Sequence, residues 1–468
     1  MTHKLQLVKG ISVYDLANGD HYKTWQYTPA TPSITRQQII DAMQAGTDNY
    51  ITVTESLQMM IYGSTRTEAR QYLNTLEQRM QEAERYATTG QGEGVYIYLQ
   101  MDGLTTTERS QILSGRFVLD DSAMYRWAAN AVEGTLYITR RYYWERSAET
   151  QIKLSDFNAN APSLSGQTVY NHTNSGYGNF VDIPTGSITG ALPTPARIEM
   201  VNPMNATRVY SNIYIANSVV YSQPNTQVSP HLSNMIQGED NVPTSSGAAE
   251  TGLTGNSGNA VLAVQFSGVA YPAWQLSANV VQPAAGKTFR LFVRNSFYSN
   301  VTGNIIYLQP QLTQNGGFAD LNSFQFEKAL PTASQNELNE IGALTFGSFP
   351  ASAALNIQVA CRSAANVRLE FDWLQALPAD NLRQLIYRGY GVAAGEAIVD
   401  NPVNGIAYQL TSLAQQLPVV TQTRRPVLLY PDTTYAQRIY FLLDINGVAT
   451  PSERLKIRMW YRPRRLTL

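Results

Sequence analysis

The chain has few of the residues on which most catalytic and metal sites depend. Its 468 residues include one cysteine and four histidines. A single cysteine excludes an intrachain disulfide, and Cys361 lies in an alternating apolar stretch, LNIQVACRS, that favours a buried structural thiol. No two histidines have the spacing of metal ligands, and no phosphate-binding or dinucleotide-binding glycine pattern occurs in a usable context. We therefore expect no metal, no cofactor and no enzymatic activity.

Long apolar runs and an excess of charge are also missing. No run of 18 apolar residues exists, which predicts no transmembrane helix and no membrane insertion. The first residues, MTHKLQLVKGISVYDL, have no apolar core of signal-peptide length, so we expect synthesis in a cytoplasm. The formal net charge is −1, whereas nucleic-acid-binding proteins carry clustered basic residues. Nucleic acid is therefore not expected as a main partner.

Tyrosine and arginine are the residues that the chain has in excess. There are 28 tyrosines against 14 phenylalanines, and only seven of the 34 basic residues are lysine. Tyrosine suits half-exposed β surfaces because its ring packs while its hydroxyl stays solvated. Arginine is favoured over lysine at protein interfaces. Both excesses indicate subunit contacts, although genomic base composition explains the arginine excess equally well.

One helix stands out, between Thr65 and Gly90. Thr65 and Glu68 form a capping box that would begin it, and Gly90 would end it because glycine adopts the left-handed conformation easily. The apolar residues follow the i, i+3, i+4, i+7 spacing of one helix face. They are Ala69, Tyr72, Leu73, Leu76, Met80, Ala83 and Ala87. The pattern predicts an amphipathic helix over residues 66–88.

The rest of the chain predicts β-strands, which makes the fold class mainly β. Residues 1–150 predict a β-sandwich or half-barrel closed by the helix. Residues 151–185 are rich in Gly, Asn, Ser and Pro and predict a linker. Residues 186–378 predict a jelly-roll-like, carbohydrate-binding-like β-sandwich. Residues 379–468 form a C-terminal β block that extends the sandwich, makes a small subdomain or returns to the first domain.

Paired carboxylates provide one candidate for catalysis. Glu370 and Asp372 share the predicted solvent-facing side of a strand with Arg368, about 7 Å apart by strand geometry. That separation would suit a two-carboxylate glycosidase. An exposed sheet face also carries such alternating charges for solubility alone, and we favour that interpretation, so no residue is assigned a catalytic role.

Aromatic residues in the linker are candidates for recognition. Tyr170, His172, Tyr177 and Phe180 lie in a Gly- and Asn-rich stretch. Aromatic rings can stack on the C–H faces of sugars, which predicts a glycan contact. The alternative is that these rings pack against their own domain or another subunit.

The C-terminal sequence MWYRPRRLTL is basic and aromatic. Arg462, Arg464 and Arg465 would suit the acidic rim of a neighbouring subunit. A solvated tail explains the same sequence equally well.

In the order and composition of its segments, the chain resembles the distal tail proteins of long-tailed, siphovirus-like bacteriophages. The resemblance rests on the helix TRTEARQYLNTLEQRMQEAERY, on the strand GTLYITRRYYWE that closes the first domain, and on an Asn-, Ser- and Thr-rich sandwich. The resemblance also rests on four later sequence segments: PARIEMVN, VYSNIYIAN, VRLEFDWLQALPADNLRQLIYRGYG and YAQRIYFLLDINGV. The long last block departs from a short distal tail protein and leaves other tail-tip or tail-decorating roles open.

The resemblance implies a structural virion protein that joins the tail tube to the tail tip or hub in a baseplate. The first domain would form a homo-oligomeric ring, usually a hexamer, and the sandwich would project and contact host surface glycans during attachment. The alternatives are a jelly-roll capsid or decoration protein and, less favoured, a β-sandwich glycan hydrolase that uses Glu370 and Asp372.

Overall fold

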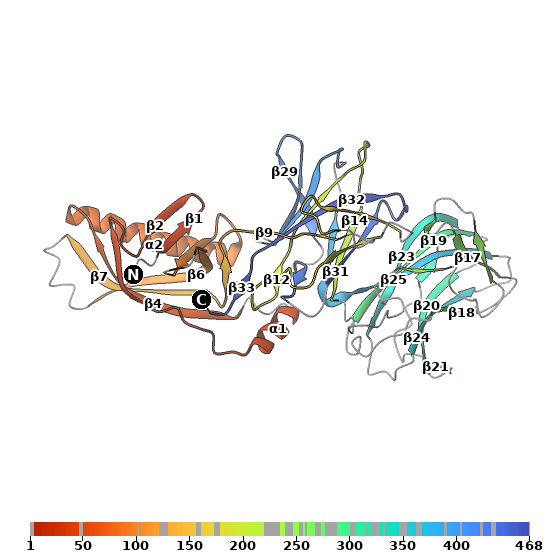
Figure 1. Ribbon diagram of the computed structural model, residues 1–468, viewed down its shortest axis with the longest axis horizontal. Helices are drawn as coiled ribbons and strands as arrows, with labels where there is room; N and C mark the ends of the chain where they lie inside the picture. The colour runs from red at the N-terminus through yellow and green to blue at the C-terminus, as the bar shows by residue number, and fades with distance from the viewer. Residues whose placement is uncertain are drawn as a thin grey trace. The chain divides into compact units, whose positions relative to one another are not determined.

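The computed structural model describes most of residues 4–467 and divides them into two units (Figure 1). Residues outside the description are 1–3, 46–49, 102, 104, 121–129, 156–160, 173–177, 220–234, 239–246, 252–255, 258–259, 267–272, 277–287, 300–305, 315–316, 320–327, 331–332, 346–352, 362–366, 388–390, 403–404, 422–424, 432–436 and 468. Unit 1 contains Met1–Thr150, Thr189–Thr194 and Tyr461–Leu468, and unit 2 contains Gln151–Ile188 and Pro195–Trp460. The predicted mainly β class is confirmed.

Unit 1 is one curled antiparallel sheet of nine strands with helices. Its strands are β1 (Lys4–Lys9), β2 (Ser12–Asp15), β3 (Tyr22–Tyr27), β4 (Thr52–Tyr62), β5 (Val95–Gln100), β6 (Glu108–Leu119), β7 (Ala131–Arg141), β8 (Trp144–Arg146) and β33 (Arg464–Arg465). The main order is β2-β1-β5-β6-β7-β4-β3, with β8 on β6 and β33 on β8. A backbone hydrogen bond shows that the sheet curls. The amide of Thr24, in β3, donates to the carbonyl of Leu16, directly after β2, at 2.9 Å. The sheet is therefore a half-barrel.

Helix α2 (Arg66–Thr89) confirms the predicted helix. The Thr65 side chain accepts a hydrogen bond from the Glu68 amide, and Gly90 has the left-handed φ of 71°. Glu68 reaches back one residue further than a standard capping box, because its carboxylate accepts from the Ser64 amide at 2.8 Å. The bond to Thr65 satisfies the Glu68 amide, one of those that the first helical turn leaves without a partner.

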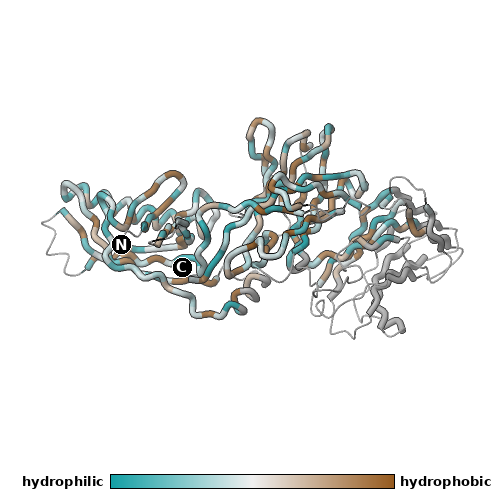
Figure 2. The backbone as a smooth tube through the Cα atoms, in the orientation of Figure 1, coloured by the Kyte–Doolittle hydropathy of each residue, from teal (hydrophilic) through white to brown (hydrophobic). Residues whose placement is uncertain are grey.

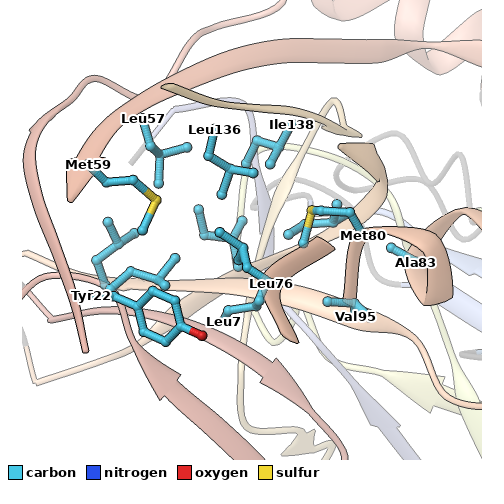
Figure 3. Close-up of a cluster of buried hydrophobic side chains, with 14 of the residues drawn as sticks. Leu7, Tyr22, Leu57, Met59, Leu76, Met80, Ala83, Val95, Leu136 and Ile138 are labelled. Carbon is cyan, nitrogen blue, oxygen red and sulfur yellow. The ribbon is translucent and has the colours of Figure 1, made fainter. Parts of the chain in front are cut away.

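The core of unit 1 lies between α2 and the concave face of the sheet (Figure 3). Leu76 and Met80 of the helix meet Leu57 and Leu136 of the central strands. Polar and apolar residues alternate along these strands, so one sheet face enters the core (Figure 2). A Cβ atom on Gly115 of β6 would lie 2.5 Å from the Met80 sulfur, so glycine there lets the helix approach the sheet closely.

The sequence analysis did not anticipate a second helix, α1 (Arg36–Ala45). Its sequence signal is a capping box formed by Thr35 and Gln38. The Gln38 amide donates to the Thr35 hydroxyl at 3.2 Å, and the Thr35 amide donates to the Gln38 side chain at 2.9 Å. Ile39 and Met43 are buried, but two apolar anchors in ten residues give too weak a periodicity to be recognised alone.

Unit 2 contains a large antiparallel sheet that combines sequence segments far apart. Its order is β10-β32-β13-β27-β28-β29-β26-β14-β31-β11. The strands are β10 (Gln167–Tyr170), β11 (Phe180–Ile183), β13 (Arg197–Val201), β14 (Asn212–Val219), β26 (Leu382–Ile386), β27 (Ala397–Asn401), β28 (Ile406–Leu410), β29 (Gln416–Thr421), β31 (Gln437–Asp444) and β32 (Arg454–Tyr461). Short strands β9 (Thr150–Gln151), β12 (Thr194–Pro195) and β30 (Leu428–Leu429) and the 3₁₀ turn η5 (Ala379–Asn381) complete the connections.

Residues 236–378 supply two further antiparallel sheets of six and five strands. The six-stranded sheet is β16-β17-β25-β19-β23 with β15 on β25, and the five-stranded sheet is β18-β24-β20-β21 with β22 on β20. The strands are β15 (Ile236–Gln237), β16 (Gly247–Thr251), β17 (Ala260–Phe266), β18 (Ala273–Leu276), β19 (Thr288–Ser299), β20 (Ile306–Gln314), β21 (Gly317–Ala319), β22 (Lys328–Leu330), β23 (Ala333–Thr345), β24 (Ala353–Cys361) and β25 (Val367–Pro378). Cys361 ends β24, and its side chain is outside the description.

The predicted C-terminal block is divided between the two units. Strands β26, β27, β31 and β32 pair with β13 and β14, which the sequence analysis placed in the sandwich range 186–378. Residues 461–468 instead belong to unit 1, where β33 pairs with β8. The block is therefore not one unit by itself: most of it pairs with strands β13 and β14, and its last residues lie in unit 1.

Candidate functional site

The C-terminal strand of unit 1 brings its arginines onto acidic residues of the same chain. Arg464 is buried, and its Nε lies 3.4 Å from the Glu145 carboxylate of β8. Arg464 also donates to the Tyr143 hydroxyl at 2.9 Å, and its guanidinium carbon lies 3.9 Å from the centre of the Tyr143 ring. These contacts are an ion pair, a hydrogen bond and a cation–π contact, all within unit 1.

Glu145 is held from a second side. Arg109 of β6 donates to it at 2.7 Å and stacks over Tyr96, with 4.4 Å between its guanidinium carbon and the ring centre. Next to this pair, Arg465 lies 4.0 Å from Glu108, whose pKa burial raises above its ordinary value. The cluster therefore joins β6, β8 and β33 by charge as well as by backbone pairing.

Arg462 completes this cluster. It donates to the backbone carbonyls of Arg146, at 3.2 Å, and Ser147, and it lies 3.7 Å from the Glu149 carboxylate. Burial lowers the pKa of Arg462, and the positive charge of Arg109 lowers it further.

Arg462, Arg464 and Arg465 each have a carboxylate partner within unit 1. The segment is not a freely solvated tail, because β33 pairs with β8. Contact of these arginines with a neighbouring subunit stays a prediction.

The predicted aromatic recognition site is not one platform. Tyr170 of β10 and His172 are half-buried neighbours, with 5.5 Å between ring centres and an edge-to-face geometry. Burial lowers the pKa of His172, and the charge of Arg294 lowers it further. Tyr177 lies outside the described residues. Tyr170 and His172 are therefore the part of this candidate site that the structure brings together.

Phe180 belongs to the core of unit 2 and not to a recognition surface. It is 4% exposed and packs edge-to-face on Tyr440 at 5.6 Å between ring centres. Arg438 covers the ring at 3.7 Å from its centre and is itself bound to Asp182 at 2.7 and 2.8 Å. The ring is therefore not available to stack on a sugar.

The predicted solvent-facing carboxylates occupy different environments. Asp372 is fully buried, pairs with Arg294 and accepts a hydrogen bond from the Ser257 amide at 2.8 Å. Glu370 is partly buried and accepts from the Ser296 hydroxyl at 2.8 Å. The prediction that both lie on a solvent-facing strand face is wrong for Asp372, because β25 is covered on both sides from Phe371 to Leu377.

Exposed apolar side chains are a feature of unit 1 that the sequence analysis missed. Eight of the thirteen large exposed apolar residues among the described positions belong to unit 1. They are Ile11, Val13, Trp25, Tyr50, Met101, Val118, Leu119 and Tyr137. Ile11, at the tip of the β1–β2 hairpin, is fully exposed, and Trp25 of edge strand β3 is 52% exposed. For Ile11 and Trp25, the signal in the sequence was an apolar residue at a turn or an edge position, where solvation alone would favour a polar one.

The described part of the chain has neither a cluster of metal ligands nor a membrane-spanning helix. Among the described residues, no three His, Cys, Asp or Glu side chains gather closely enough to hold a metal ion. None of the helices in those residues has the length and apolar character needed to span a bilayer.

Comparison with known proteins found only distant similarity. No protein-family model matches the chain, and no curated protein matches it. A Podospora anserina GH26-CBM35 β-(1,4)-mannanase is 16% identical over 31% of this chain, with a TM-score of 0.21. The chain covers 27% of that enzyme.

Two baseplate structures were also found. The phage P2 baseplate in its activated conformation with Ca is 7% identical over 76% of this chain and 98% of that chain, with a TM-score of 0.26. The phage p2 baseplate with Sr is 8% identical over 79% of this chain and 98% of that chain, with a TM-score of 0.22. At these values the similarities are weak and carry no argument for fold or function.

Proposed function

We propose that this protein is a structural component of a phage tail, in which unit 1 forms a homo-oligomeric ring between the tail tube and the tail tip. The single observation that supports an assembly role is the set of exposed apolar side chains on unit 1. The resemblance of the sequence to distal tail proteins supports the tail as the place of assembly.

The exposed residues suit contacts between protein subunits. Trp25 and Tyr137 are of the aromatic types that dominate the energy of protein interfaces. Trp25 also donates to the Gln58 side chain at 3.1 Å, which holds the ring in one orientation before any partner binds. Ile11, at the tip of the β1–β2 hairpin, is a second exposed apolar residue of the unit. A ring requires a head-to-tail contact between copies, which closes when the rotation allows it.

The proposal for unit 2 is contact with glycans on the host surface. Tyr170 and His172 are its supporting residues, since their rings are neighbours and only partly buried. A glycan screen of the wild-type chain and of Tyr170→Ala tests this part separately from assembly. Equal binding by both would contradict a role for this pair.

Electron microscopy of the purified chain, with mass photometry on the same sample, tests the ring. Closed rings of about six copies are expected, and Trp25→Ser with Ile11→Ser is expected to reduce them to smaller species. Thr54→Ser, on the same sheet, is the control and should leave rings intact.

Other outcomes would favour the alternatives. A shell-like lattice would favour a capsid or decoration protein. Polysaccharide cleavage that Glu370→Gln abolishes would favour a glycan hydrolase. A chain that stays monomeric at high concentration and is absent from particles would contradict the proposal.

A further inference from the structure

The solvent face of α2 carries charges in an ordered series. Arg66, Arg70, Glu77 and Glu84 are all exposed. At 3.6 residues per turn, the four positions fall within an arc of about 40° and extend over about 27 Å of helix axis. We call these four residues the α2 stripe. Its first half is basic and its second half is acidic.

This order opposes the preferences of the helix itself. A helix N-terminus carries partial positive charge and favours acidic side chains, whereas the C-terminus favours basic ones. Arg66 and Arg70 are also like charges at i and i+4, a spacing that destabilises a helix. The first-turn acid, Glu68, is on another side, where it accepts hydrogen bonds from Ser64 and from the Tyr72 hydroxyl. The helix dipole therefore disfavours Arg66, which lies in the first turn, and the like-charge spacing disfavours the pair of Arg66 and Arg70.

We propose that the α2 stripe is a docking surface for a second copy of this chain, which binds by two-fold symmetry with the two α2 helices antiparallel. A two-fold axis near residue 75 places Arg66 of each copy beside Glu84 of the other. It also places Arg70 within one turn of Glu77 of the other copy. The stripe is self-complementary only in this antiparallel arrangement, because parallel helices would align like charges.

The antiparallel arrangement also removes the conflict within each helix. Each basic N-terminal half lies beside the acidic half and the negative dipole end of the other helix. A two-fold contact uses the same patch on both copies, so it is separate from the head-to-tail surfaces at Ile11 and Trp25. It depends neither on the ring nor on the tail.

Exposed ion pairs are weak and are screened by salt. The contact is therefore expected to weaken when sodium chloride is raised from low concentration to about 1 M, where the screening length is about 3 Å. Its role is to fix the orientation of two copies more than to supply affinity.

Single charge reversals in the full chain test the pairing. Arg70→Glu creates two like-charge contacts across the axis, as does Glu77→Arg. Each variant alone is expected to self-associate at least tenfold more weakly than wild type in sedimentation at low salt. An equimolar mixture of the two should restore association as one-to-one heterodimers, because every facing pair is then opposite in charge. The double variant Arg70→Glu/Glu77→Arg should associate like wild type.

Two controls separate docking from folding. Arg85→Glu makes the same change of charge on an exposed position of α2 that lies outside the stripe, and it should leave association unchanged. Arg70→Glu should not lower the melting temperature, because it replaces the like-charge pair of Arg66 and Arg70 with a pair of opposite charge. Two outcomes would overturn the proposal. The wild-type chain would form no two-fold dimer, or the mixture of Arg70→Glu and Glu77→Arg would associate no better than either variant alone.

Discussion

Substitution of Arg464 by alanine is the sharpest test of how the C-terminal segment is used. Arg464→Ala removes the ion pair with Glu145, the 2.9 Å hydrogen bond to Tyr143 and the stacking on that ring. A hydrogen bond to a charged group contributes about 1.5–3 kcal/mol, and a cation–π contact contributes about 0.5–2 kcal/mol. Glu145 keeps its 2.7 Å bond to Arg109, so no buried carboxylate is left unpaired. The expected loss is about 2–3 kcal/mol from the unfolding free energy of unit 1.

The assay is urea unfolding followed by hydrogen exchange of peptides that cover β6 and β8, because exchange there reports on unit 1 alone. The matched control is Arg465→Ala. Its side chain is more exposed and lies 4.0 Å from Glu108, so the expected loss is below about 1 kcal/mol. If Arg464→Ala leaves unfolding unchanged but reduces assembly of the chain, the residue works between subunits and our assignment is wrong.

Three further substitutions test the buried contacts and one carboxyl group. Arg140→Met leaves the fully buried Glu55 carboxylate without its guanidinium partner, and it should lower the stability of unit 1 by about 3–5 kcal/mol in urea unfolding; a loss below 1 kcal/mol would contradict this. Hydrogen bonds from Ser64 and Tyr72 lower the pKa of Glu68 from 4.5 to about 2. The stability that ionised Glu68 contributes is therefore present above pH 4.5 and disappears as the pH falls to about 2, and Glu68→Gln should flatten this part of the pH profile of thermal unfolding. Phe180→Ala should lower the unfolding free energy of unit 2 by about 3–5 kcal/mol. An unchanged unfolding curve would contradict the assignment of Phe180 to the core.

Local signals were sufficient wherever the determining contacts lie close in sequence. Helix α2 was predicted to within one residue because Thr65, Glu68 and Gly90 define its ends through bonds within four residues. The missed helix α1 carries the same kind of signal at Thr35 and Gln38. That capping box is a local signal, whereas the apolar periodicity of α1 is too weak to predict the helix without it.

The excess of arginine shows how a composition can have a structural cause that periodicity does not reveal. Among the residues that the structure describes, three arginines form ion pairs in which both partners are fully buried. They are Arg140 with Glu55, Arg294 with Asp372 and Arg383 with Asp400. Arginine suits such sites because its planar guanidinium makes several hydrogen bonds at once. Part of the arginine excess therefore lies in buried ion pairs within the units. Composition alone does not distinguish these arginines from arginines at interfaces.

The sequence by itself determined the mainly β class, the long helix and its caps, and the alternation that gives unit 1 its core. Only the tertiary structure decided the partners of the C-terminal arginines and the double coverage of Asp372. The hydrogen bond between Arg464 and Glu145 joins residues separated by 319 positions. Helical and strand periods specify which side of an element is apolar, but not which distant element covers it. That choice depends on charges and shapes that meet only after the chain has folded.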